Sequence, residues 1–348
     1  MRGVLLSALA LSLVALAPNS QARPGRAESD AAYALYATPQ QRVQVDAGHY
    51  IHMVCMGQGS PTVILSAGAD GWSADWRLVQ PQIAKTTRVC GWDRAGHGFS
   101  SGSPEPQDII HTEADLEKAL AGAGVTGPLV MVAHSLGAFE TFLFTDRHPD
   151  RVVGMVLVDP SAPGQAEALP RAAPALMAWS DRSDEVFFDA VRRCVSALKS
   201  REAGPSRDCA KLHARYPEPL RANLTGATND PLYWESFLSM FQSKNLDSKL
   251  AINAKRSYGN MPLVVLHAGV FAFPNAPADA QQDVPAAKAL ITSEHEAMAR
   301  LSTRGAFVRV DDSAHAISVQ RPDVVIDAVA KVIAQARAES RSLPLSRE

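Results

Sequence analysis

The sequence lacks a charge excess of either sign. Lys and Arg together number 34, against 36 Asp and Glu among 348 residues, which gives a formal net charge of −2. Proteins that bind nucleic acid usually carry a basic patch or stripe, and a near-neutral balance does not supply one. Composition therefore gives no indication of a nucleic-acid partner, and it leaves the oligomeric state open.

Metal-binding signatures and long apolar runs are also scarce. The chain has no HExxH motif and no clear cluster of Cys and His ligands. We interpret His295, which lies between two glutamates, as part of a solvated helix face. No stretch after residue 17 approaches the roughly 20 apolar residues that span a bilayer. We therefore expect no metal, no organic cofactor and no membrane span in the mature chain.

The N-terminus has the pattern of a secretory signal peptide. Arg2 supplies a positive charge, residues 4–17 form an uncharged apolar run, and SQA at 20–22 offers small residues for a signal peptidase. The apolar run is too short for a membrane anchor, which is the alternative. We predict cleavage after Ala22 and export to the periplasm or the medium. Residues 23–40 are then a flexible leader, and residues 339–348 a flexible tail.

Four cysteines are present, and in an exported protein they can form two disulfides. Cys194 and Cys209 lie on either side of the turn-forming AGP at 203–205, and we predict that they are bonded. Cys55 and Cys90 fall in two segments that we expect to be neighbouring strands. For this second pair a disulfide and two buried thiols are both open.

From residue 43 onward, short β-branched runs alternate with amphipathic helical stretches, which is the pattern of a mostly parallel sheet covered on both faces. Between residue 161 and about residue 260 only helical patterns occur. The simplest architecture is a sheet domain, residues 41–160 and 261–338, interrupted by a helical insertion at 161–260. We predict strands at residues 50–56, 62–66, 88–92, 129–133, 152–158, 262–267 and 306–310.

The strongest motif is VMVAHSLGA at residues 130–138. An apolar strand runs into a helix through a turn with small residues two before and two after Ser135. This is the pattern of a nucleophile elbow, in which a strained turn projects the serine oxygen at the sheet edge. Small flanking residues are needed because strand and helix approach closely there. Ala133 stands where the first glycine of the motif is usual.

A second motif, DRAGHGFS at residues 93–100, also follows a predicted strand. Together with the elbow about 40 residues later, it resembles the α/β-hydrolase superfamily, in particular its esterase- and lipase-like branch with a helical cap. The resemblance covers residues 43–338, loosely in the insertion. It implies an α/β fold with a mostly parallel eight-stranded sheet flanked by helices and a helical cap inserted after strand 6. It also implies a structural role for the second motif, so we assign no catalysis to Asp93 or His97.

In this family a serine, an acid and a histidine follow one another along the chain. His315 lies in VDDSAH at 310–315, after the final predicted strand, where the family has its catalytic histidine. No carboxylate stands at the usual acid position after the strand at 262–267, and Asp279 and Asp283 come later than expected. Asp159, which ends the preceding strand, resembles a variant of some family lipases. We prefer Asp159 because a strand end holds a side chain rigidly.

The resemblance also implies two backbone N–H groups that stabilise an oxyanion. One is that of Leu136, and the other comes from SAGADG at residues 66–71, with Ala69 as the candidate. An aromatic stripe in the insertion either lines an apolar acyl pocket or packs within the cap. This stripe consists of Trp234, Phe237 and Phe241.

The sequence therefore predicts a serine hydrolase that acts on an ester-like small molecule through an acyl-enzyme. Ser135 is the nucleophile, His315 its base and Asp159 the acid that orients the base. Dehalogenases and epoxide hydrolases of the superfamily are disfavoured, since they carry aspartate at the nucleophile position. The alternatives are a non-catalytic ligand-binding member of the fold, and a peptidase or lactonase with the same triad.

Overall fold

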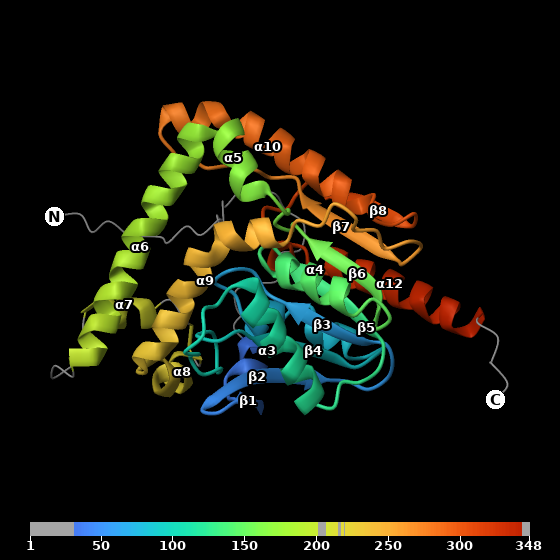
Figure 1. Ribbon diagram of the computed structural model, residues 1–348, viewed down its shortest axis with the longest axis horizontal. Coiled ribbons are helices and arrows are strands. Elements are labelled where there is room, and N and C mark those ends of the chain that lie inside the picture. Colours follow the sequence, from blue (N-terminus) through green and yellow to red (C-terminus); the bar gives the residue numbers. More distant parts are fainter. Residues whose placement is uncertain (1–30, 201–206, 215–216, 219, 343–348) are drawn as a thin grey trace.

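The computed structural model describes residues 31–200, 207–214, 217–218 and 220–342, whose elements are shown in Figure 1. One sheet has the strand order β1-β2-β4-β3-β5-β6-β7-β8. Strand β2 pairs antiparallel with β1 and β4, and all other neighbours are parallel, which confirms the predicted mostly parallel eight-stranded sheet. The strands are β1 (Gln41–Asp46), β2 (His49–Met56), β3 (Thr62–Ser66), β4 (Val89–Asp93), β5 (Leu129–His134), β6 (Val152–Val158), β7 (Leu263–Ala268) and β8 (Gly305–Val310).

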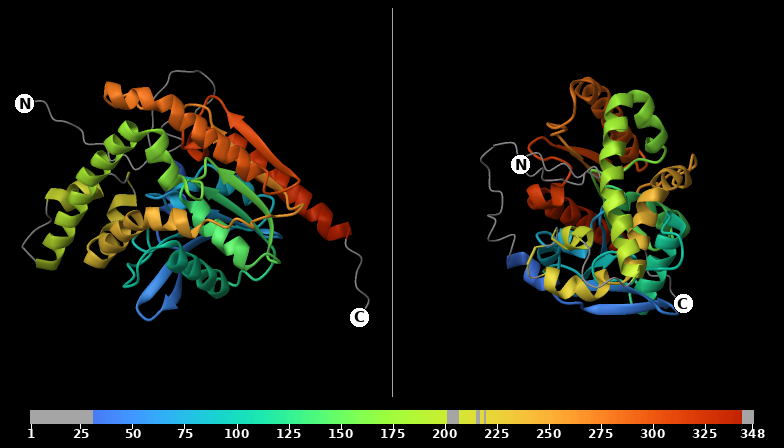
Figure 2. Two further views of the ribbon diagram at one scale, coloured as in Figure 1. Left: turned by 45° about the horizontal axis from the view of Figure 1, so that its top comes forward. Right: turned by 90° about the vertical axis from the view of Figure 1, so that its left-hand side faces the viewer.

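Helices cover both faces of the sheet, so alternate residues of the central strands enter two separate cores. On one face Met131 and Leu157 pack against residues of α3 (Ile109–Gly122) and α4 (Gly137–Arg147). On the other face Val132 and Val158 pack against α12 (Pro322–Ser342). Figure 2 shows α12 and the α3–α4 pair on opposite sides of the sheet. The remaining core elements are η2 (Ser73–Trp76), α2 (Gln80–Ile83), α10 (Ala278–Ala299) and α11 (Ile317–Gln320).

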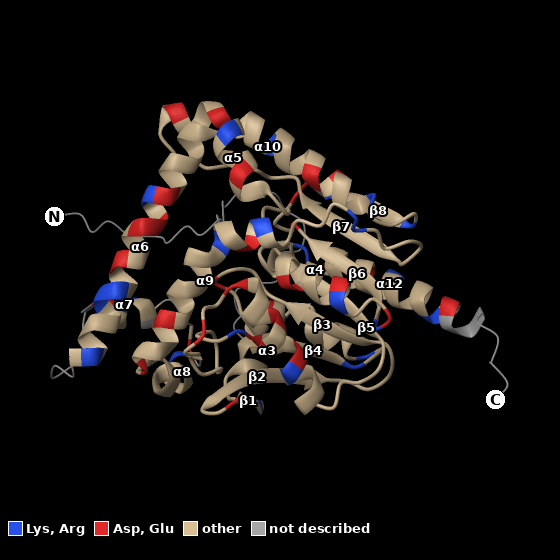
Figure 3. Ribbon diagram, viewed as in Figure 1, with Lys and Arg blue, Asp and Glu red and all other residues tan. Residues whose placement is uncertain are grey.

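Between β6 and β7 the described residues form helices and no strand, as the sequence predicts. Basic and acidic residues are interspersed along α6 and α9 (Figure 3), in keeping with the balanced composition. Residues of α5, α6 and α9 line a cavity together with Ser135, so this insertion borders the carboxyl end of β5. The helices are α5 (Gln165–Ala172), α6 (Pro174–Ser200), α7 (Arg207–His213), α8 (Leu220–Thr228) and α9 (Pro231–Leu250).

Both cysteine pairs are bonded. Cys194 of α6 and Cys209 of α7 form the predicted disulfide, with a Cα–Cα distance of 4.9 Å. Cys55 of β2 and Cys90 of β4 stand directly opposite each other in the antiparallel register, with a Cα–Cα distance of 4.1 Å, and form the second. The pairing that the sequence left open is therefore decided by strand register.

The two ends of the described chain differ from the prediction. Residues 31–40, expected in a flexible leader, include the short helix η1 (Tyr33–Tyr36). Tyr36 is buried, and its hydroxyl donates a hydrogen bond of 2.8 Å to Gln80 Oε1, because the ring fills a space beside η2. Helix α12 continues to Ser342, beyond the expected start of the tail. The predicted signal peptide lies outside the described residues.

Candidate active site

Ser135 occupies a strained turn between β5 and α4. Its φ of +52° lies in the left-handed region, which residues other than glycine rarely adopt. The turn is tight because α4 starts close to β3: a Cβ at Gly137 would lie 2.5 Å from the carbonyl oxygen of Ala67. Ala133 is fully buried, so a methyl group is tolerated at that position. The small residues on both sides of Ser135 thus have the steric reason that the motif predicts.

Asp159 has the same unusual backbone at the end of the neighbouring strand β6. With a φ of +43°, it and Ser135 are the only non-glycine residues of the described chain at positive φ. The amide of Asp159 donates to Leu266 O at 2.7 Å, and its Oδ1 accepts from the amide of Ala268 at 2.9 Å. Strained backbone that several hydrogen bonds hold in place is a frequent feature of functional sites.

His315 reaches Asp159 from the loop between β8 and α11. Its Nδ1 lies 2.6 Å from Asp159 Oδ2. Its carbonyl oxygen accepts a hydrogen bond of 3.0 Å from Nε2 of His134, a residue of the elbow itself. Burial lowers the pKa of His134 to about 3, so this imidazole is neutral and donates from Nε2. The loop is thereby fixed to the strand that carries the serine. The sequence did not single out His134.

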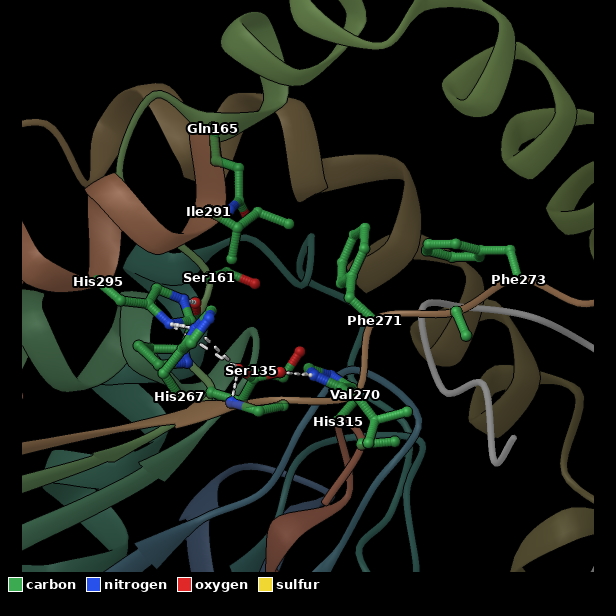
Figure 4. Close-up of a pocket in the computed structure, with 15 residues that line it drawn as sticks. Ser135, Ser161, Gln165, His267, Val270, Phe271, Phe273, Ile291, His295 and His315 are labelled. Carbon is green, nitrogen blue, oxygen red and sulfur yellow. Dashed lines mark hydrogen bonds and ion pairs between the residues drawn. The ribbon is translucent and has the colours of Figure 1, made fainter. Parts of the chain in front are cut away.

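The electrostatics favour an ionised Asp159. Burial raises the pKa of its carboxyl group, but its interactions with His315, His295 and the amide of Ala268 together outweigh burial and hold that pKa well below the usual range. The carboxylate then accepts the proton on Nδ1 of His315, which leaves Nε2 of the neutral ring free to accept a proton. Ser135 and His315 line the same pocket (Figure 4), so the arrangement is suited to general-base catalysis.

The two other candidate acids, Asp279 and Asp283, both lie on α10. Asp279 is exposed in the first turn of that helix. Asp283 accepts hydrogen bonds from the amides of Ala175 and Leu176, at 2.7 and 3.1 Å, and so caps the start of α6. Among the described carboxylates, Asp159 is the one that contacts His315.

The predicted oxyanion donors both border the cavity beside Ser135. Leu136 is the residue at the start of α4, and Ala69 belongs to the loop after β3. That loop approaches the elbow closely, since a Cβ at Gly68 would lie 3.0 Å from His134 Nδ1. Glycine therefore lets the backbone of the loop come against the turn that holds the serine.

The second motif, DRAGHGFS, holds this loop in place. Arg94 donates to the carbonyl oxygens of Ala67 at 2.7 Å and Gly68 at 3.0 Å, and it forms a buried ion pair with Glu140 of α4. A ring nitrogen of His97 lies 3.0 Å from Ala69 O. His97 thus has the structural role expected from the sequence, and Arg94 links the loop to α4.

A buried histidine pair lies behind Asp159. His295 of α10 and His267 of β7 face each other, with their Nδ1 atoms 2.9 Å apart and each 3.8 Å from Asp159 Oδ1. The prediction that His295 belongs to a solvated helix face is wrong: its side chain is fully buried. The apolar residues at 291 and 298 share its face of α10, and this spacing was the signal that the neighbouring glutamates obscured.

A run of hydrogen bonds leads from His267 through His295 to the carbonyl oxygen of Pro160, next to Asp159. Burial lowers the pKa of both rings, that of His295 to about 4, so both are neutral. His295 donates from Nε2 to Pro160 O at 2.8 Å and accepts at Nδ1 from His267. The Nε2 of His267 lies 3.1 Å from the Thr292 hydroxyl, which also lies 2.8 Å from Lys288 O. A ring nitrogen of each histidine and a carboxylate oxygen of Asp159 lie within 4.8 Å of one another, close enough to hold a metal ion. Both histidines and Asp159 already make hydrogen bonds within the protein.

A cavity of about 180 Å³ extends from Ser135 under the inserted helices. Of the aromatic stripe, Phe241 lines this cavity, whereas Trp234 and Phe237 are buried in the core between α9 and its neighbours. Trp234 donates from its indole nitrogen to Thr228 O at 2.8 Å, so its polar group is satisfied within the inserted helices. Packing therefore accounts for two of the three rings.

The sequence of residues 61–268 matches the family model of the alpha/beta hydrolase fold. The chain belongs to this family. A curated relative, an uncharacterised protein of Schizosaccharomyces pombe, is 42% identical over 81 residues, which are 23% of this chain and 15% of that protein. The chain spans between 15% and 42% of the length of the first curated relatives that it matches.

Solved structures share the alpha/beta hydrolase fold over nearly the whole length. A thermophilic esterase from Thermogutta terrifontis is 21% identical, with 85% of this chain and 99% of that chain covered and a TM-score of 0.54. A probable hydrolytic enzyme from Pseudomonas aeruginosa is 17% identical, with 86% and 95% covered and a TM-score of 0.59. These neighbours show that the fold is shared. No helix within the described ranges combines the length and apolarity needed to cross a bilayer.

Proposed function

We propose that this protein is a serine hydrolase that cleaves ester-like bonds in small molecules through a Ser135–His315–Asp159 triad. The observation that supports this most is the 2.6 Å contact between His315 Nδ1 and Asp159 Oδ2 beside Ser135. The serine and the aspartate also share the rare left-handed backbone. Another acid could orient His315 only by replacing Asp159 at Nδ1 of that ring.

In the proposed mechanism, neutral His315 accepts the proton of Ser135 at Nε2 while the serine oxygen attacks the substrate carbonyl. Asp159 keeps the proton of the imidazole on Nδ1 and stabilises the imidazolium that forms. The amides of Leu136 and Ala69 are the proposed donors to the oxyanion, and a donor of this kind contributes about 10²–10³ in rate. The imidazolium returns its proton to the leaving alcohol, and water then releases the acyl group by the reverse route.

Labelling with a fluorophosphonate probe tests the nucleophile. The native chain should be labelled, and Ser135→Ala should not. Ser161→Ala is the matched control because Ser161 lines the same cavity and should leave labelling intact. Hydrolysis of 4-nitrophenyl esters should follow the same pattern. Labelling that persists in Ser135→Ala and disappears in Ser161→Ala would contradict the assignment.

We also propose that the protein is exported. Two disulfides are typical of an oxidising compartment. The apolar segment that suggests a signal peptide lies outside the described residues. Sequencing the N-terminus of protein recovered outside the cytoplasm should give Arg23 as the first residue, and a chain that retains Met1 there would contradict cleavage.

A further inference from the structure

The cavity next to Ser135 contains a buried carboxylate with an unused oxygen. Asp184 of α6 lines this cavity and is 6% exposed. Its Oδ2 lies 3.5 Å from Lys244 Nζ of α9, whereas its Oδ1 has no hydrogen-bond partner. A buried polar atom without a partner is unfavourable, and more so when the group is charged. Because the Asp184 side chain lines the cavity, a ligand there can supply the donor that its second oxygen lacks.

The surroundings of Asp184 are negatively charged. Asp70, from the loop after β3, and Asp181, one turn earlier on α6, line the same cavity. The only Lys or Arg among its lining residues is Lys244, whose Nζ lies 3.4 Å from Asp181 Oδ1. The two carboxylates of α6, Asp181 and Asp184, thus share one ammonium. Burial raises the pKa of Asp184 to about 6, so its carboxyl group is mostly ionised at pH 7.

We propose, on the basis of the hydrolase function above, that the substrate carries a positively charged nitrogen which binds Asp184 while the scissile carbonyl lies at Ser135. A cationic donor satisfies Oδ1 and also offsets the excess negative charge, whereas a neutral hydroxyl or amide does only the first. The ligand therefore has an amine or guanidinium at one end. Its middle is apolar, because Phe139, Met177 and Phe241 also line the cavity.

Three 4-nitrophenyl esters of equal chain length test this. Each has a six-carbon acyl chain that ends in a guanidinium, a hydroxyl or a methyl group. A charge-assisted hydrogen bond contributes about 1.5–3 kcal/mol, which corresponds to about 10- to 150-fold. We expect kcat/KM of the native protein to be higher by at least about tenfold for the guanidinium ester than for the other two.

The variant Asp184→Asn keeps the shape of the side chain and removes its charge. The guanidinium-to-methyl ratio of kcat/KM should fall to near one. Fluorophosphonate labelling of the same sample reports whether the variant has folded around an intact Ser135. Glu185→Gln is the matched control: it also removes one acid from α6, but this side chain is exposed and paired with Arg192, so the ratio should not change.

Equal kcat/KM for the three esters with native protein would overturn the inference and leave the hydrolase proposal standing. Equal preference for the hydroxyl and guanidinium esters would overturn it in favour of a neutral donor. A guanidinium preference that survives in Asp184→Asn would also overturn it. Absence of both labelling and hydrolysis in the native protein would overturn the proposed function and this inference together.

Discussion

Replacing Asp159 with asparagine tests the acid of the proposed triad, because its surroundings determine how the new amide is oriented. In the native structure Oδ1 accepts from the amide of Ala268 at 2.9 Å, and Oδ2 faces Nδ1 of His315 at 2.6 Å. An NH₂ group at the first position would meet the N–H of Ala268, donor against donor. The amide oxygen must therefore take that position and turn the NH₂ toward His315.

The consequence is a change of tautomer. An NH₂ facing Nδ1 requires Nδ1 to accept, so the single proton of neutral His315 moves to Nε2. That nitrogen can then no longer take the proton of Ser135. The same substitution in the best-studied triad, that of the chymotrypsin-like proteases, lowers kcat by about 10⁴. At about 1.36 kcal/mol per factor of ten, this adds about 5.4 kcal/mol to the barrier.

The assay is kcat/KM for a 4-nitrophenyl ester near neutral pH, with Asp279→Asn as the control. Asp279 is an exposed side chain on α10, so the control makes the same chemical change away from His315. We expect a loss of about 10⁴ for Asp159→Asn and none for the control. Loss of less than about tenfold at position 159, with a large loss at 279, would refute the tautomer argument.

Three further predictions concern packing, crosslinking and pH. Gly137→Ala should lower Tm sharply, because its Cβ would lie 2.5 Å from a carbonyl oxygen, whereas Gly226→Ala, with nothing within 4 Å, should raise it slightly; calorimetry distinguishes the two. Replacing Cys194 and Cys209 by serine opens a loop with a sequence separation of 15 and should cost about 3 kcal/mol in denaturant unfolding; an unchanged midpoint would contradict this. The guanidinium-to-methyl ester ratio should fall as the pH drops through about 6, where Asp184 takes up a proton, and a flat ratio would exclude that carboxylate.

The parts of the fold that the sequence predicts are those encoded locally. The apolar run of β5 and the small residues around Ser135 lie within a few positions of one another, so strand, turn and helix could be inferred together. The Cys55–Cys90 pair shows where local information ends. That these strands are neighbours follows from the pattern, but the bond depends on register, which the whole sheet sets.

The parts that were missed depend on which faces of helices meet in space. His295 is buried because α10 packs against β7, and His267 supplies its partner from 28 positions earlier in the chain. Tyr36 is buried for a similar reason, since its hydroxyl meets Gln80, which is 44 positions away. Exposure was expected for His295 from its neighbouring glutamates and for Tyr36 from its place in the leader. In both cases a distant hydrogen-bond partner made burial possible.

The residues of the proposed triad differ in how the fold positions them. Strands β5 and β6 pair in register up to their ends, and the amides of Ser135 and Ser161 bridge the two strained turns, donating to Val158 O at 3.2 Å and Ser135 O at 2.9 Å. Because the sheet fixes Ser135 and Asp159 relative to each other, only the histidine depends on a loop. That loop is held by the Nδ1 contact with Asp159 and by the bond from His134 to the carbonyl oxygen of His315. A change in either contact therefore acts on the proposed base and leaves the strained turn of the proposed nucleophile in place.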